Sequence, residues 1–148
     1  MSALTSWVLS IALLVHDGHG FTKRMPVAMA EAIDAAATAN PFDGDIRYTA
    51  ALLTVFAFRE SSYRSDVEGD CDASKTHCHS AGAWQTPAGS TSHDVAKQAV
   101  YALKLMHESA EKCESAPLAV YAGGCGNSQA RRISTVRMAL AHELAVTP

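Results

Sequence analysis

A glutamate at the end of a long apolar run is the residue best placed for acid–base chemistry. The run from Ile46 to Phe58 is followed at once by Arg59 and Glu60. Wound as a helix, this segment places Glu60 on the same face as Ile46, so the carboxylate points along the buried side where the helix stops. A carboxylate partly removed from water can hold a proton near neutral pH, as a general acid must. The alternative is an ordinary surface glutamate at a frayed helix end.

Helices must position this residue. Asp45 has the side chain and the place of an N-cap, which predicts a helix over residues 45–59. Pro26 suits the start of an earlier helix that runs to residue 38. Three later helices are expected, over residues 92–112 with Thr91 or Ser92 as N-cap, over 117–121, and over 128–144. The polar stretch 63–85 is expected to form a loop or small β-hairpin, so the fold class is mainly α.

The first 20 residues allow two interpretations. Trp7–Val15 is an apolar run too short to span a bilayer, although its length suits the core of a signal peptide. No Lys or Arg precedes it, and His16–Gly20 is a poor cleavage site, so there is no clear signal peptide. We favour a buried first helix ending at Gly18.

Composition bounds the class of protein. The chain has 148 residues, 48% of them hydrophobic, which suits a single domain with a substantial core. Its net charge of −3 argues against a general nucleic-acid binder. No segment predicts stable membrane insertion, and no motif calls for a cofactor. The sequence leaves the oligomeric state undetermined.

The last predicted helix combines an apolar face with a basic one. The expected inner face consists of Ile133, Val136, Leu140 and Leu144. The arginines expected to lie off that face are Arg131, Arg132 and Arg137. A solvated basic surface is the simpler interpretation of these arginines, and contact with an acidic polymer is the sharper one.

Four cysteines admit three disulfide pairings. Pairing of neighbours in sequence, Cys71 with Cys78 and Cys113 with Cys125, is the simplest, and each bond would close a loop that packing orders poorly. Bonded cysteines would place the protein outside a reducing cytosol.

Zinc is the rival interpretation of the first cysteine pair. Cys71, His77, Cys78 and His79 are ligand types that zinc favours, but their spacing matches no familiar finger. We therefore expect no metal, and a small zinc-stabilised interaction domain is the minor alternative.

Three segments in order resemble the soluble lytic transglycosylases and goose-type lysozymes. Phe58–Tyr63 (FRESSY) resembles the Glu-Ser motif of that family, Gly82–Gln85 (GAWQ) its Gly-Leu-Met-Gln turn, and Ala119–Gly124 (AVYAGG) its Ala-Tyr-Asn-Ala-Gly segment. The resemblance covers roughly residues 45–144, within a catalytic core of about 43–144. Two departures stand out, because Ala83-Trp84 replaces Leu-Met and Ala122 stands where the family has asparagine.

The resemblance implies a lysozyme-like helical domain and a role for each matching residue. Glu60 would protonate the glycosidic oxygen between N-acetylmuramic acid and N-acetylglucosamine. Ser62 would contact the substrate or orient Glu60, Gln85 would bond a sugar, and Tyr121 would place its hydroxyl near Glu60. Trp84 is either a core aromatic or a sugar-stacking wall of the cleft.

The number of catalytic carboxylates separates two reactions. A hydrolase usually adds a second carboxylate, for which Asp66 and Asp70 are the first candidates. A lytic transglycosylase resembles half of that scheme, since the C6 hydroxyl of the substrate attacks and one glutamate acts as acid and then base.

Peptidoglycan glycan strands are therefore the expected partner. The resemblance implies an extracytoplasmic protein, which could be secreted, periplasmic or associated with a phage. A catalytically inactive lysozyme-like module is the alternative. Such a module would bind glycan or have a structural role in a phage particle or secretion apparatus.

Overall fold

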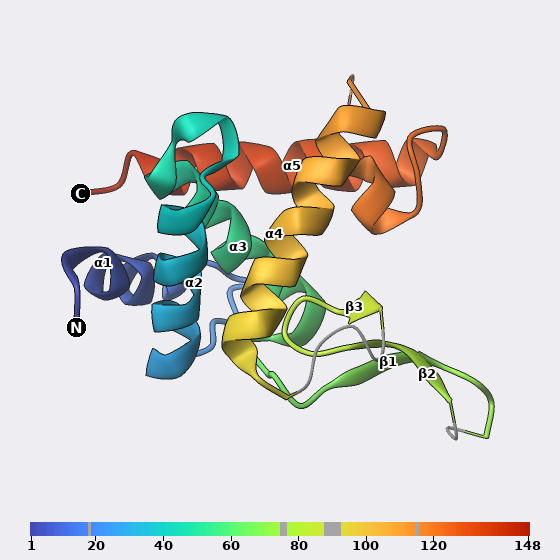
Figure 1. Cartoon of the computed structure of the whole chain (residues 1–148), viewed down its shortest axis with the longest axis horizontal. Coiled ribbons are helices and arrows are strands. Elements are labelled where there is room, and N and C mark those ends of the chain that lie inside the picture. The colour runs from blue at the N-terminus through green and yellow to red at the C-terminus, as the bar shows by residue number, and fades with distance from the viewer. Residues whose placement is uncertain (18, 75–76, 88–92, 115) are drawn as a thin grey trace.

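The computed structural model describes residues 1–17, 19–74, 77–87, 93–114 and 116–148. It is mostly helical with a small antiparallel sheet, as the sequence predicts (Figure 1). The α-helices are α1 (Ala3–Ala12), α2 (Val27–Ala39), α3 (Ile46–Ser61), α4 (Val95–Lys112) and α5 (Ser128–Ala145). Two 3₁₀ turns, η1 (Phe42–Gly44) and η2 (Ala119–Ala122), join them. The strands are β1 (Glu68–Cys71), β2 (Cys78–Ala81) and β3 (Thr86–Pro87).

Helix α3 is the centre of the molecule. Every residue from Tyr48 to Phe58 is buried, so the helix has no solvent face over that span. Helices α1, α2, α4 and α5 pack around it, and the sheet lies near its C-terminal end (Figure 1). The predicted cap is confirmed, because the Asp45 side chain accepts a hydrogen bond from the backbone N–H of Tyr48. A helix buried on all sides is held in place by its neighbours rather than by its own amphipathic pattern.

The N-terminal segment forms a helix that belongs to the core. Trp7, Val8 and Ile11 are buried against the other helices. Helix α1 ends at Ala12, earlier than expected, and Gly18 lies outside the described residues. The indole N–H of Trp7 donates to the carbonyl of Thr147 (3.0 Å), which ties the two ends of the chain together.

The caps of the later helices agree with the sequence in part. Helix α5 begins at residue 128 as predicted, and Asn127 caps it by accepting from the backbone N–H groups of Gln129 and Ala130. The N-cap of α4 is Asp94, where Thr91 or Ser92 was predicted, and those two residues lie outside the described part of the chain. None of the helices in the described ranges is both long and apolar enough to cross a lipid bilayer.

The sheet has the order β1-β2-β3, with both neighbouring pairs antiparallel. Cys71 lies opposite Cys78 in the first hairpin, and Ala81 lies opposite Thr86 in the second. The sheet therefore extends slightly beyond the predicted region 63–85. Small strands of this length rely on packing against the helices for stability.

The inner face of α5 differs from the prediction. Its buried residues are Ala130, Ser134, Ala141 and Leu144. Val136, expected inside, is 54% exposed. Leu144 is buried as predicted, and Leu140 packs partly buried against the core. The other buried residues of this face are small and let α5 approach α3 closely, so a search for large apolar side chains misses them.

We predict that enlarging this face destabilises the protein. Ala141→Leu should lower the free energy of unfolding by about 1–3 kcal/mol, because Ala141 is fully buried and extra methyl groups overpack the contact. The matched control is Ala139→Leu on the exposed side of the same helix, which should change stability little. Urea unfolding followed by circular dichroism measures both. Equal effects of the two substitutions would contradict the assignment of the inner face.

Candidate active site

Glu60 lies in the last turn of α3, where left-handed residues end the helix. Ser62 and Tyr63 both have positive φ angles, and their N–H groups bond back to the carbonyls of Phe58 (2.8 Å) and Ala57 (3.3 Å). Neither is glycine, so this backbone is sustained by its surroundings. The buried hydroxyl of Tyr63 donates to the carbonyl of Ala12, which anchors the turn to α1. The backbone at Glu60 is thus held by helix α3 before it and by the anchored Ser62–Tyr63 turn after it.

The carboxylate of Glu60 pairs with the guanidinium of Arg137 on α5. The side chains are 23% and 14% exposed, respectively, so the pair is largely shielded from solvent. The guanidinium carbon also lies 4.6 Å from the centroid of the Phe56 ring, a cation–π contact that holds Arg137 over α3. The expectation that Arg137 lies off the inner face of α5 is therefore wrong. The guanidinium occupies the carboxylate oxygen that would face a substrate, so the pair must open before Glu60 can act on one.

The position of Arg137 had a signal in the sequence. Ala130, Ser134, Arg137 and Ala141 recur at intervals of three and four, which is the spacing of one helix face. Arg131, Arg132 and Arg137 look alike by charge, so sorting the helix by charge hides the face of small residues that includes Arg137.

Tyr121, on η2, lies close to the Glu60–Arg137 pair. Its ring meets that of Phe56 edge to face at 5.0 Å, and its hydroxyl donates to the backbone carbonyl of Trp84. Burial raises the pKa of Tyr121, the negative charge of Glu60 raises it further, and Arg137 opposes this. The hydroxyl is therefore neutral and lies within electrostatic reach of the Glu60–Arg137 pair. The structure thus brings together the three segments that carry the resemblance.

Two buried serines hold η2 in position. Ser134 on α5 accepts a hydrogen bond from the N–H of Leu118, and Ser109 on α4 accepts one from the N–H of Val120, both at 3.1 Å. These bonds fix the backbone on either side of Ala119, so Tyr121 is set by contacts to two helices. Sequence reasoning assigned no role to either serine.

Trp84 is a core residue. Its side chain is fully buried, and its indole N–H donates to the carbonyl of Leu53 at 2.9 Å. No face of the ring is open for a sugar to stack on, so the expectation of a stacking wall is replaced by the core alternative. The turn that carries it is held by Gln98 of α4, whose side-chain oxygen accepts from the N–H of Ala83 (3.0 Å). Gly82 is required there, because a Cβ on it would approach Gln98 to 2.5 Å at a positive φ.

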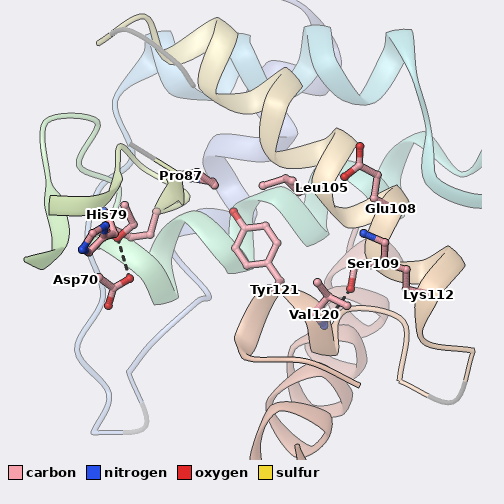
Figure 2. Close-up of a pocket in the computed structure, with 11 residues that line it drawn as sticks. Asp70, His79, Pro87, Leu105, Glu108, Ser109, Lys112, Val120 and Tyr121 are labelled. Carbon is pink, nitrogen blue, oxygen red and sulfur yellow. Dashed lines mark hydrogen bonds between the residues drawn. The ribbon is translucent and has the colours of Figure 1, made fainter. Parts of the chain in front are cut away.

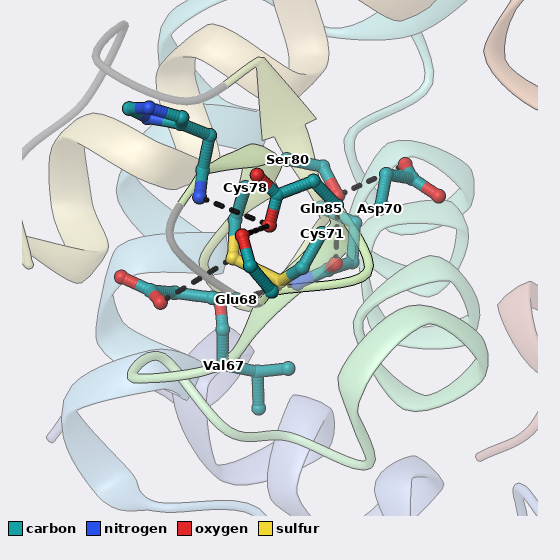
Figure 3. The surroundings of a disulfide bond; sticks show 10 residues. Val67, Glu68, Asp70, Cys71, Cys78, Ser80 and Gln85 are labelled. Atoms are coloured by element: carbon teal, nitrogen blue, oxygen red, sulfur yellow. Dashed lines mark hydrogen bonds between the residues drawn. A yellow bond between two sulfur atoms is a disulfide. The ribbon is translucent and has the colours of Figure 1, made fainter.

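Gln85 uses its amide inside the protein. Its nitrogen donates to the carbonyls of Val67 and Gly82, and its oxygen accepts from the hydroxyl of Ser80, as the surroundings in Figure 3 illustrate. A Cβ at Gly69 would come within 1.9 Å of that oxygen, so glycine makes room for the amide. Gln85 is thereby a brace between the strands, and its contact with substrate stays a prediction.

A cleft of about 330 Å³ opens between the sheet, α4 and η2 (Figure 2). Glu60 does not line this cleft, but Tyr121, its electrostatic neighbour, does. The side chains that reach the cleft include two acids, a lysine and a histidine, namely Asp70, Glu108, Lys112 and His79. Such a lining suits a polar ligand that forms many hydrogen bonds.

The two candidate second carboxylates lie in different settings. Asp66 is exposed and hydrogen-bonded to Arg64, which lowers the pKa of the Asp66 carboxyl. Asp70 lines the cleft, and its carboxylate lies 3.1 Å from the Ser80 hydroxyl, whose proton it shares with the amide oxygen of Gln85 (Figure 3). Asp70 is therefore the better placed of the two. Ser62 is partly exposed beside Glu60 in sequence, and its predicted contact with substrate remains a prediction.

The predicted disulfides are both present. Cys71–Cys78 closes the β1–β2 hairpin (Figure 3), and Cys113–Cys125 ties the end of α4 to the segment before α5. Their sulfur atoms are thus engaged, and within the described ranges no three His, Cys, Asp or Glu residues are grouped to hold a metal ion. Two disulfides indicate an oxidising environment outside the cytosol.

Comparisons with protein-family models, with curated proteins and with solved structures found no match for this chain.

The buried ion pair should be measurable by a double-mutant cycle. Arg137→Gln alone should destabilise the protein by about 1–3 kcal/mol, because Glu60 is left partly buried and unpaired. Adding Glu60→Gln should recover part of this loss, giving a coupling energy of about 1–2 kcal/mol. Chemical unfolding of the four proteins measures it.

Arg132→Gln provides the control for this cycle, since it removes an exposed arginine from the same helix without affecting the pair. A coupling energy near zero between Arg137 and Glu60 would show that the pair does not form in solution.

Proposed function

We propose that this protein cleaves the glycan strands of peptidoglycan, with Glu60 as the general acid and base. The observation that carries the proposal is that Tyr121 links two other segments. Its hydroxyl bonds the carbonyl of Trp84 in the Gly82–Gln85 turn, and it lies within electrostatic reach of Glu60. These are the segments that resemble the lytic transglycosylases and goose-type lysozymes, and they come from separate parts of the chain. A cleft that Tyr121 lines, with charged and hydroxyl side chains set among apolar ones, adjoins these segments, as binding of a sugar polymer requires.

Because Arg137 pairs with Glu60, the first step of the proposed mechanism is the opening of this pair. Substrate entering beside Glu60 separates its carboxyl group from the guanidinium, so that the carboxyl group faces the glycosidic oxygen. In its acid form it then delivers its proton to that oxygen as the C–O bond breaks. The carboxylate left behind is again the form that Arg137 stabilises. Tyr121 places a neutral hydroxyl beside the same charge.

The second half of the reaction has two forms. In a transglycosylase, ionised Glu60 accepts the proton of the substrate's C6 hydroxyl, which attacks C1 and forms a 1,6-anhydro sugar. In a hydrolase, water attacks instead, and Asp70 is the carboxylate from which we expect help. A muramidase of this kind would act outside the cytosol, as a secreted, periplasmic or phage-associated protein.

One feature favours a second candidate function. Glu60 is paired with Arg137 and absent from the lining of the cleft, as in a site that binds glycan without cutting it. An inactive glycan-binding or structural module would keep the fold and retain this pair. Product release from intact peptidoglycan separates the two candidates.

The test is mass spectrometry of purified peptidoglycan incubated with the protein. Anhydro-muropeptides, lighter by one water than hydrolysis products, would identify a transglycosylase, and hydrated reducing ends would identify a muramidase. Glu60→Gln should abolish release of either product, because the amide cannot deliver a proton. Glu31→Gln, an exposed glutamate on α2, is the matched control and should retain full activity.

Two results would overturn the proposal. Lysis by Glu60→Gln at the wild-type rate would remove Glu60 from the mechanism. Binding of glycan by the wild-type protein with no released product would favour the inactive module.

A further inference from the structure

A second hollow adjoins the Glu60–Arg137 pair. It is a groove of about 350 Å³ between the end of α3 and one face of α5. Its lining, which we call the arginine groove, consists of Arg59, Gln129, Arg132, Ile133, Val136 and Arg137. Arg137 thus connects the two sites, since it lines the groove and also holds Glu60.

The arginine groove concentrates positive charge in a protein that is acidic as a whole. Three of its lining residues are arginines and none is an acid, while the chain carries a net charge of −3. Arg59 and Arg132 are exposed, and neither forms an ion pair with any acidic residue in the described part of the chain. Their guanidinium groups offer planar pairs of N–H donors that are free to bind an anion.

We propose that the arginine groove binds the carboxylate groups of the peptides that branch from peptidoglycan strands. This inference rests on the proposed function, because it names a further part of the same substrate. The stem peptide is attached to the N-acetylmuramic acid ring whose bond to the next sugar is to be cut. A strand with that bond at Glu60 therefore has its first peptide residues close by, on the side of Arg59 or on that of the cleft.

Charge decides between these two sides. The cleft presents two acids, Asp70 and Glu108, beside a single lysine, whereas the groove presents three guanidinium groups, no acid, and exposed apolar surface at Val136. Stem peptides carry free carboxylates on a D-glutamyl residue and at the C-terminus, together with alanine methyl groups. The Glu60 carboxylate already pairs with Arg137 at this groove, which supports a carboxylate as its ligand.

Two adjacent arginines give a matched pair of variants for the test. Arg132 lines the groove, whereas Arg131 is an exposed arginine of the same helix that does not. The probe is a soluble stem tetrapeptide without sugar, titrated into the wild-type protein and followed by NMR chemical shifts. We expect binding that weakens about threefold in Arg132→Gln and in Arg59→Gln, as for solvent-exposed charge pairs, and is unchanged in Arg131→Gln. Higher ionic strength should weaken it as well.

A second measurement uses glycan strands with and without their peptides. The wild-type protein should cleave peptide-bearing strands faster than strands stripped by an amidase, and Arg59→Gln/Arg132→Gln should reduce this preference. Stripped strands should be cut by that variant at the wild-type rate. No difference between Arg131→Gln and Arg132→Gln in the titration, or no binding of the tetrapeptide, would overturn the inference. Tetrapeptide binding without cleavage of either kind of strand would instead contradict the proposed function and support peptide binding by the arginine groove.

Discussion

The burial of the middle of α3 is the constraint on which the rest of this structure depends. Eleven consecutive residues, from Tyr48 to Phe58, have no solvent-facing side, so other elements must surround them. The helix emerges from the core at its two ends, and Glu60 lies in its last turn. The hydrophobic effect therefore determines where the carboxylate is, because burying the apolar run leaves its end at the boundary with solvent.

The ion pair is the electrostatic consequence of this placement. A carboxylate partly removed from water is costly unless it has a counter-charge or a proton. Arg137 supplies the counter-charge, and the Phe56 ring holds the guanidinium in place through a cation–π contact. Arg137 also lines the basic groove, and Glu60 lies within electrostatic reach of Tyr121, which lines the acid-containing cleft. In the proposed mechanism, this pair must open before Glu60 can act on a substrate.

Positioning of the proposed site relies on buried polar groups as much as on packing. Ser109 and Ser134 fix η2, Gln98 fixes the turn at Ala83, and Gln85 braces the strands. The two serines and Gln98 each pair with a backbone N–H group, and Gln85 adds a second hydrogen bond to the carbonyls of Val67 and Gly82. These contacts explain why short segments with little regular structure are held where the three motifs meet.

The sequence by itself determined the helical class and the central helix with its Asp45 cap, and it favoured a loop or small hairpin in the region of the sheet and the two disulfide pairs that the structure contains. These depend on local patterns, since caps, apolar periodicity and cysteine spacing act over a few residues. Only the tertiary structure decided the burial of Trp84, the internal use of the Gln85 amide and the partnership of Arg137 with Glu60. Each depends on which face of one element meets another far along the chain. Residues 60 and 137 meet because a face of small residues lets α5 approach α3, and a pattern search weighted towards large apolar side chains does not detect such a face.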